Sequence, residues 1–449
     1  MRSTVTPFRV KSISLFFIDC AVVAFVLCVS YGIVLLNNRT ATQDILRTIP
    51  VCIVFYAVVQ GFLFYMFDAY SIKSDFRKTK SIFKLVLPVV LASWLFYGIS
   101  RWLPHTFSPG MLSVQAVSLV GLCYLWRYLF FHKSICGKKV ERVAVVGGGK
   151  LLRELAEDIR HYDLQKFDLL EMDMGDPEDF EEKTRRLLGK VDAIVTSPPH
   201  YARLRSLFPA ASPSRPRVYD AAEFYSVLYS TIPLSSITDA WASLHSKDIS
   251  RGKLFWRIFE VICASLILVA TLPIFSIIAI LIKMDSKGPI FFRQKRVGLG
   301  GKLFTILKFR TMEDMPKGGG NALTGDRRPR VTGVGRILRR IHMDELPQFI
   351  NVLKGDMGLI GPRPISQELE SHLEKVIPYH SIRYSIRPGI TGWATVNYYV
   401  SHAVDEKDEI SEFARILESD LFYIYNASLI LDLYILLKTV KITLRGCFR

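Results

Sequence analysis

The chain has 449 residues, half of them hydrophobic, and carries a formal net charge of +17. This length allows two or three structural units. Such an apolar and basic composition is typical of a membrane protein with a cytosolic face, or of a protein that handles phosphates. The 7 cysteines form no CxxC pair and lie mostly inside apolar runs, which argues against a disulfide framework and a zinc site.

Four apolar runs come first and cover residues 12–36, 49–67, 85–100 and 111–131. Each is close to the roughly 20 residues that a helix needs to cross a bilayer. Lys and Arg are concentrated at the N-terminus and after the second and fourth runs, which places both the N-terminus and the remainder of the chain in the cytosol. A buried bundle in a soluble protein is the alternative, but four such close runs disfavour it. We predict a four-helix transmembrane block over residues 1–137.

The next segment, residues 138–230, alternates apolar strand patterns with helical ones, beginning with "RVAVVGG". This alternation predicts a small parallel α/β module of the doubly wound, Rossmann-like type. Gly147 and Gly149 match the first two glycines of a dinucleotide loop, but Leu152 takes the third position. Glu171 and Asp173 fall near the spacing of a ribose-binding acid. A nucleotide site therefore stays open beside a spacer or regulatory role. A linker is expected over residues 231–250.

A fifth apolar run covers residues 254–282 and contains Pro273. Both of its flanks are basic, which disfavours a straight crossing because the two ends would then lie on opposite sides of the membrane. We therefore expect a re-entrant helix that breaks at Pro273 and returns to the cytosolic face. A kinked fifth span is the alternative.

Between residues 251 and 340 there are 18 Lys or Arg and 5 acids. This concentration suits phosphate binding beside an anionic leaflet, although a merely basic face is the simpler explanation for charge alone. The stretches "FFRQKRVG" and "KLFTILKFRTM" alternate apolar and basic residues, like strands that bring Arg296, Lys308 and Arg310 together. "GVGRILRRIHM" predicts an amphipathic helix in the membrane interface, with Ile337, Leu338 and Ile341 on its apolar side.

Two adjacent carboxylates, Asp344 and Glu345, open the stretch "DELPQFINVLKG". Pro347 belongs to the first turn of a helix, so Asp344 is a candidate N-cap. The same position suits a nucleophile toward phosphorus, and the neighbouring carboxylate suits Mg²⁺. Both interpretations remain open on the local sequence.

Two later turns, "GPRP" at 361–364 and "RPGITGW" at 387–393, each present one arginine. Arg363 and Arg387 are suited to bidentate contacts with phosphate. A surface ion pair is the plain alternative for each of them.

Taken together, "FFRQKRVGLGGKLFTILKFRTM", "DELPQFINVLKGDMGLIGPRP", "IRPGITGWATVN" and "DLFYIYNASLILDLYILLKTV" resemble the bacterial sugar transferase family. The resemblance covers residues 251–449 and implies a monotopic phosphoglycosyl transferase domain. With the four N-terminal helices and the Rossmann-like module, the chain is similar to the larger members. The fold class expected is thus an α/β membrane protein with these three parts.

The resemblance implies a polyprenyl-phosphate glycosyl-1-phosphate transferase, in which a sugar-1-phosphate passes from a UDP-sugar to undecaprenyl phosphate and UMP is released. It implies Asp344 as the nucleophile that forms a phosphosugar intermediate and Glu345 as the Mg²⁺ ligand. Asp420, in the last motif, joins the expected substrate-binding residues, which also include Arg296, Lys308, Arg310, Arg363 and Arg387.

The expected location is the bacterial inner membrane, multi-pass, with the catalytic domain on its cytoplasmic face and membrane lipids around it. The expected role is to begin an exopolysaccharide, capsule or O-antigen unit, with a hexose favoured as the sugar. No nucleic-acid partner is expected, and a homo-oligomer is left open. A catalytically silent scaffold and a nucleotide-sugar oxidoreductase are the alternatives.

Three positions depart from the family pattern. Leu272 precedes the break proline where Ser is frequent, Arg328 stands where Asp is usual, and Thr395 replaces a Gln. None of these departures touches the carboxylate pair.

Overall fold

The computed structural model describes residues 7–37, 42–69, 79–100, 109–136, 141–161, 167–173, 190–197, 200–201, 204, 216–237, 253–313, 330–398 and 409–447. It divides into two compact units, an N-terminal one that ends near residue 141 and a second that contains nearly all the rest. The predictions concerning residues 178–189, 238–250 and Arg328 lie outside the described residues, as do the side chains of Glu171 and Asp173.

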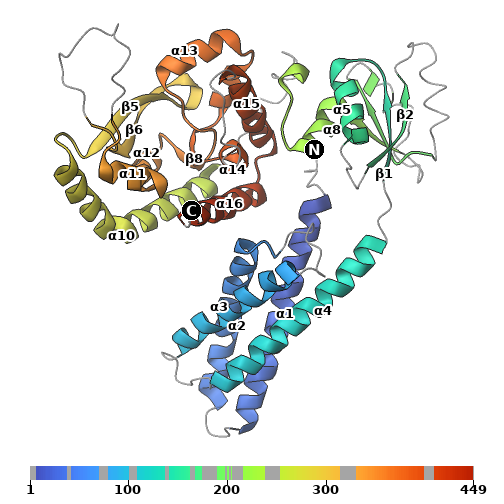
Figure 1. Ribbon diagram of the computed structural model, residues 1–449, viewed down its shortest axis with the longest axis vertical. Coiled ribbons are helices and arrows are strands. Elements are labelled where there is room, and N and C mark those ends of the chain that lie inside the picture. Colours follow the sequence, from blue (N-terminus) through green and yellow to red (C-terminus); the bar gives the residue numbers. More distant parts are fainter. Residues whose placement is uncertain are drawn as a thin grey trace. The chain divides into compact units, whose positions relative to one another are not determined.

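The N-terminal unit consists of the four predicted helices, shown in blue to cyan in Figure 1: α1 (Pro7–Asn37), α2 (Thr42–Met66), α3 (Thr79–Ser100) and α4 (Pro109–Cys136). Their inner faces form an apolar core that includes Leu27, Tyr56 and Phe96. Within the described residues, α3 and α4 contain stretches long and apolar enough to cross a membrane, whereas residues 16–30 of α1 and 50–66 of α2 form shorter apolar helices.

One ion pair lies inside this apolar bundle and joins its first and last helices. Arg127 of α4 bonds to Asp19 of α1, and both side chains are nearly inaccessible. Arg127 Nη1 also donates to the Ala69 carbonyl at 2.7 Å, and Trp126 Nε1 donates to Asp19 at 3.0 Å. A buried charge is tolerated only when it is paired in this way.

The Rossmann-like module is a four-stranded sheet in the order β2-β1-β3-β4. Its strands are β1 (Glu141–Val146), β2 (Phe167–Asp173), β3 (Ala193–Thr196) and β4 (Arg217–Asp220), and the described helices α5 (Lys150–His161) and α8 (Ala221–Tyr229) pack with them. The β1–β3 and β3–β4 pairs are parallel, as predicted. Leu152, at the third position of the glycine pattern, is buried in the module.

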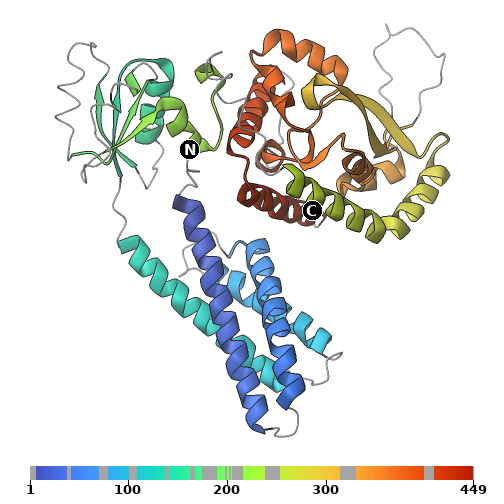
Figure 2. The same ribbon diagram turned by 180° about the vertical axis from the view of Figure 1, so that it is seen from behind.

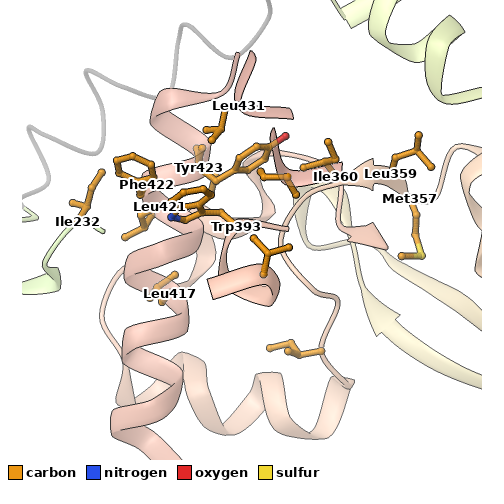
Figure 3. Close-up of a cluster of buried hydrophobic side chains, with 14 of the residues drawn as sticks. Ile232, Met357, Leu359, Ile360, Trp393, Leu417, Leu421, Phe422, Tyr423 and Leu431 are labelled. Atoms are coloured by element: carbon orange, nitrogen blue, oxygen red, sulfur yellow. The ribbon is translucent and has the colours of Figure 1, made fainter. Parts of the chain in front are cut away.

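The second unit continues with a short segment that packs onto the catalytic domain, although it belongs to the expected linker. Ile232 and Ile237 flank η2 (Leu234–Ser236) and join the largest apolar core of the chain. Ile232 lies beside Leu421 and Phe422 in Figure 3.

Hydrogen bonds fasten the same segment. Trp393 Nε1 donates to the Ser230 carbonyl at 2.8 Å. The amides of Ile232 and Leu234 donate to the main-chain and side-chain oxygens of Glu418 at 3.0 and 3.1 Å. Residues 230–237 thus act as a strap that completes the core of the catalytic domain.

The catalytic domain surrounds this core with one long helix, two small sheets and several shorter helices. Its elements are α10 (Lys253–Asp285), β5 (Phe291–Val297), η3 (Leu299–Gly301), β6 (Leu303–Phe309), α11 (Gly333–Arg340), η4 (Met343–Glu345), α12 (Gln348–Lys354), β7 (Gly358–Ile360), α13 (Gln367–Val376), η5 (His380–Ser385), β8 (Gly389–Thr391), α14 (Trp393–Tyr398), α15 (Glu409–Asn426) and α16 (Leu429–Cys447). β5 and β6 form an antiparallel hairpin, and β7 pairs with β8 in parallel.

Helix α10 is helical throughout, with Pro273 inside it, and its ribbon bends partway along (Figure 1 and Figure 2). Its 33 residues correspond to about 50 Å of helix. Most of its apolar surface has no protein cover, as Leu266, Val269 and Leu272 illustrate. It is the third described helix that is long and apolar enough to cross a membrane.

Helix α11 begins as capping rules predict, because the Thr332 hydroxyl accepts a bond from the Gly335 amide at 2.9 Å. The predicted single apolar face is wrong. Leu338 is buried against Phe309 and Ile282 of α10, whereas Ile337 is 62% exposed. Leu338 thus binds the helix to the domain and leaves Ile337 at the surface.

Arg310 is among the residues predicted to bind phosphate, but in the structure its side chain bonds to the protein's own Ser286 and Lys287. Its side chain is buried, and its guanidinium donates to the Lys287 carbonyl at 3.0 Å and to the Ser286 carbonyl and hydroxyl at 2.8 and 2.9 Å. These groups lie just beyond the last residue of α10, where helix carbonyls lack main-chain partners. Arg310 therefore joins the strand hairpin to the end of α10.

The strap yields a first prediction. We expect Ile232→Ala to lower the local stability of the catalytic core by about 2–5 kcal/mol, because it leaves a cavity against Phe422. Hydrogen exchange in the full chain should become faster at residues 417–424. Ile410→Ala, at an exposed position of α15, is the matched control, and equal exchange in both variants would show that the strap adds nothing.

A second prediction concerns Arg310. We expect Arg310→Gln to cost about 2–4 kcal/mol of stability, because the shorter amide cannot satisfy the oxygens that the guanidinium binds. Thermal unfolding of the purified protein measures this loss. Arg293→Gln, at an exposed position of the same hairpin, should unfold like the wild type. A stable Arg310 variant with weakened donor binding would instead support direct phosphate contact.

Candidate active site

The two carboxylates lie in a short turn between α11 and α12. His342 has a left-handed backbone (φ 56°), and the single turn η4 that follows contains Asp344 and Glu345. The capping residue of α12 is Pro347, so the predicted N-cap role of Asp344 is wrong. The pair lies instead in the turn at which the chain reverses direction between α11 and α12.

Apolar residues on either side of the pair hold this turn against α10. Met343 and Leu346 pack on the cluster formed by Ile278 and Ile282 of α10 together with Phe309 of β6. The residues that flank the carboxylates therefore pack on α10, much of whose apolar surface is exposed.

Glu345 lies between two cations that come from different segments. Lys308 Nζ of β6 and Arg363 Nη2 each donate to Glu345 Oε1 at 2.7 Å. Burial acts to raise the pKa of Glu345, but the charges and hydrogen bonds of Arg363 and Lys308 outweigh it and lower the pKa to about 2. Relative to the usual 4.5, this shift corresponds to about 3 kcal/mol in favour of the ionised carboxylate.

Asp344 has a different electrostatic environment. Burial and the adjacent charge of Glu345 raise its pKa, while the charges of Lys308 and His342 oppose that rise. The two neighbouring carboxyl groups thus have pKa values displaced in opposite directions. Such divergence is typical of carboxylate pairs whose members have different roles.

Arg296 of β5 is the third predicted cation near Glu345. Its Nη1 donates to the Pro364 carbonyl at 3.1 Å and its Nη2 to the Gln294 side chain at 2.7 Å. Burial, with the nearby positive charge of Arg363, lowers the pKa of Arg296. Arg296, Lys308 and Arg363 therefore gather around one carboxylate, as the strand patterns predicted for the first two.

Asn351 supports this arrangement, and sequence reasoning missed it. Its side chain is fully buried, accepts from the Leu307 amide at 3.0 Å and donates to the Thr305 carbonyl at 2.8 Å. It fixes α12 to β6 next to Lys308. The helix that follows the carboxylate pair is thereby held to the strand that carries the cation bound to Glu345. The available signal was a polar residue among the apolar ones of "QFINVL".

The turn that carries Arg363 is held by a close approach of two chain segments. The Gly361 amide donates to the Thr391 carbonyl at 2.9 Å, and the Gly389 amide donates to the Pro362 carbonyl at 3.0 Å. A Cβ added to Gly389 would lie 2.1 Å from the Gly361 nitrogen. Only glycine permits this contact, which explains the "GPRP" and "RPGITG" pattern in physical terms.

The other two predicted substrate-binding residues lie elsewhere in the domain. Asp420 is 1% exposed and accepts from Arg383 Nη2 at 2.9 Å, so its expected direct contact with substrate is wrong in this structure. Burial raises the pKa of Asp420 to about 6 despite that partner. Arg387 is half-buried at the entry to β8, and its charge acts on Glu260 of α10. Arg383 was not singled out from the sequence.

A metal would find few ligands here from the protein alone. Among the described residues there is no group of three or more His, Cys, Asp or Glu that could hold an ion. Mg²⁺ commonly keeps several waters and is held by one or two carboxylates together with substrate phosphates. The pair Asp344 and Glu345 fits that mode of binding, in which the substrate supplies the remaining ligands.

Comparison with known proteins places the chain among sugar transferases. A model of the bacterial sugar transferase family matches residues 251–446. A UDP-N-acetylgalactosamine-undecaprenyl-phosphate N-acetylgalactosaminephosphotransferase of Aeromonas hydrophila is 43% identical over 183 residues, which are 40% of this chain and 42% of that protein. A UDP-glucose:undecaprenyl-phosphate glucose-1-phosphate transferase of Escherichia coli K12 is 38% identical over 189 residues, covering 42% of this chain and 40% of that one.

The matches to these two relatives thus span about two fifths of their lengths. A longer match is to a UDP-glucose:undecaprenyl-phosphate glucose-1-phosphate transferase of Xanthomonas campestris, 31% identical over 373 residues, which are 76% of this chain and 73% of that protein. The chain belongs to the bacterial sugar transferase family.

Proposed function

We propose that this protein transfers a sugar-1-phosphate from a UDP-sugar to undecaprenyl phosphate and releases UMP. The observation that carries the proposal is the carboxylate pair, in which Glu345 is clamped by Lys308 and Arg363 while Asp344 beside it has a raised pKa. The names of the relatives, which include both acceptor and UDP-sugar donors, support the same reaction class.

In the first step the Asp344 carboxylate attacks the phosphorus that bears the sugar. A bond forms between Asp344 and that phosphorus, and the bond to the departing UMP breaks. In the second step a phosphate oxygen of undecaprenyl phosphate attacks the same phosphorus. The aspartyl bond then breaks, which regenerates Asp344 and leaves a lipid diphosphate sugar.

The cations around Glu345 have two tasks in this scheme. They keep Glu345 ionised, and Lys308, Arg296 and Arg363 oppose the charge that accumulates on the phosphate oxygens. Glu345 would hold Mg²⁺, which would supply further neutralisation of that charge. Nucleophilic attack requires the ionised form of Asp344, which burial and the charge of Glu345 disfavour and the charges of Lys308 and His342 favour.

We further propose that α10 is re-entrant and keeps the domain on the cytoplasmic face of the bacterial inner membrane. Its bend, the basic residues at both ends and its uncovered apolar surface support this. Because Met343 and Leu346 pack on α10, the pair lies near the depth at which a lipid phosphate resides. The donor sugar we expect is a hexose, and the product would begin an exopolysaccharide, capsule or O-antigen unit.

Release of UMP tests the whole proposal. Purified protein in lipid should release UMP only when a UDP-sugar and Mg²⁺ are present, and a panel of UDP-sugars identifies the donor. A folded protein that releases no UMP from any donor in the presence of undecaprenyl phosphate would leave the scaffold interpretation standing.

We expect Asp344→Asn to abolish turnover, by at least about 10³-fold, because an amide cannot form the phosphoaspartyl bond. Thermal unfolding should change by less than about 1 kcal/mol, since the Asp344 side chain caps no helix. Trapping with a labelled donor should label the wild type and not the variant. Near-normal turnover by the variant would remove Asp344 from the mechanism.

We expect Glu345→Gln to lower kcat by about 10²-fold or more and to raise the Mg²⁺ concentration needed for half-maximal rate, because a neutral amide is a weaker ligand for Mg²⁺ than a carboxylate. Initial rates across a Mg²⁺ titration measure both effects. Glu368→Gln, at an exposed position of α13, serves as a control of equal charge change. An unaltered titration in Glu345→Gln would argue against metal binding there.

A further inference from the structure

Arg383 lies beneath the turn that presents Arg363. Its side chain is 3% exposed and comes from η5, between α13 and β8. Its Nη2 nitrogen donates to the Arg363 carbonyl and to Asp420 Oδ2, both at 2.9 Å. One buried nitrogen therefore connects the turn at 361–364 to α15.

The Arg363 side chain and main chain are thereby held by different partners. The guanidinium reaches Glu345 at 2.7 Å, while the carbonyl of the same residue is bound by Arg383. The next carbonyl, that of Pro364, is bound by Arg296. Because these two bonds fix the main chain around Arg363, its side chain can adopt fewer conformations in which the guanidinium is away from Glu345.

The desolvation cost of burying Arg383 and Asp420 indicates that this ion pair has a role other than stabilising the fold. Two buried charges of opposite sign roughly cancel their own desolvation cost, and apolar residues of similar volume would stabilise a core equally well or better. Arg383 and Asp420 are 3% and 2% exposed. What apolar residues could not supply is the hydrogen bond to the Arg363 carbonyl.

The surroundings of Arg383 restrict its own movement. Glu370 of α13 accepts from the Tyr384 hydroxyl and contacts His380 Nδ1 at 3.1 Å, which ties η5 to α13 on both sides of Arg383. Burial and the charge of Arg383 lower the pKa of His380 to about 4, so the imidazole is neutral at pH 7 and adds no competing charge.

We propose that Arg383, held by Asp420, is a positioning residue that fixes the Arg363 carbonyl and thereby keeps the Arg363 guanidinium on Glu345. Its kinetic consequence rests on the proposed transfer of sugar-1-phosphate. The structural consequence, an ordered turn at 361–364, does not depend on that activity.

The kinetic test exchanges the pair for apolar residues in the full chain. Arg383→Met combined with Asp420→Leu should fold, because volume is kept and no buried charge is left alone. We expect kcat/KM for the UDP-sugar to fall by about 10- to 100-fold, the usual effect of removing a group that orients a site residue. Arg383→Lys, which keeps the charge but has a shorter reach, should lose activity in the same direction.

A double-mutant cycle separates positioning from a general loss of packing. If Arg383 acts through Arg363, the Met and Leu exchange should have less than about a threefold further effect in an Arg363→Gln background. Full additivity of the two losses, or wild-type kinetics in the apolar double variant, would overturn the proposal.

Hydrogen exchange provides a readout that holds even if the enzyme assignment fails. The peptide covering residues 361–366 should exchange at least about tenfold faster in the apolar double variant than in the wild type. Asp432→Asn is the matched control, because this buried carboxylate of α16 accepts from Tyr423 at 2.7 Å within the same core. Unchanged exchange at 361–366 would refute positioning, whereas absence of UMP release by the wild type would refute the proposed function alone.

Discussion

The catalytic domain depends on the charge of a single carboxylate, Glu345. This group is largely withdrawn from water, and an isolated buried carboxylate would protonate or be expelled. Lys308 and Arg363 prevent this by donating to the same carboxylate oxygen, one from a strand hairpin and the other from a glycine-bounded turn. The same two bonds also fix where those cations lie, so the carboxylate and its partners order one another.

Around this clamp the domain places three polar side chains, of which Asn351 and Arg383 are buried and Arg296 is half-buried. Asn351 ties α12 to β6, Arg296 binds the Pro364 carbonyl and Arg383 binds the Arg363 carbonyl. Each bonds to a main-chain group of a segment that carries a site residue. Hydrogen bonds from side chains to these main-chain groups restrict how the segments can be arranged, which suits a site that must hold its charges at fixed distances.

Apolar packing has a separate task on either side of the site. On one side, the cluster around Trp393, Leu421 and Phe422 is completed by the strap at 230–237, outside the stretch that the family model matches (Figure 3). On the other side, α10 offers the domain only one face, with Ile278 and Ile282, and leaves the rest uncovered. Arg310 fastens the end of α10 to the strand hairpin.

The sequence by itself determined much of this protein. Long apolar runs predicted the four N-terminal helices and α10, because the period and length of an apolar stretch are local properties. Alternating strands and helices predicted the parallel sheet of the module, and the motifs around Asp344, Glu345, Lys308 and Arg363 predicted the family. Those residues lie within or beside turns and strand ends, and such elements are determined by the local sequence.

Only the tertiary structure decided which charged residues face the site and which serve the core. Arg310 and Asp420 looked equivalent to Lys308 and Arg363 in the sequence, yet one caps α10 and the other pairs with Arg383. The sequence likewise assigned the strap to a linker and Leu338 to an outward apolar face. Each of these outcomes depends on a partner far away in the chain, since burial and pairing arise only when distant segments meet.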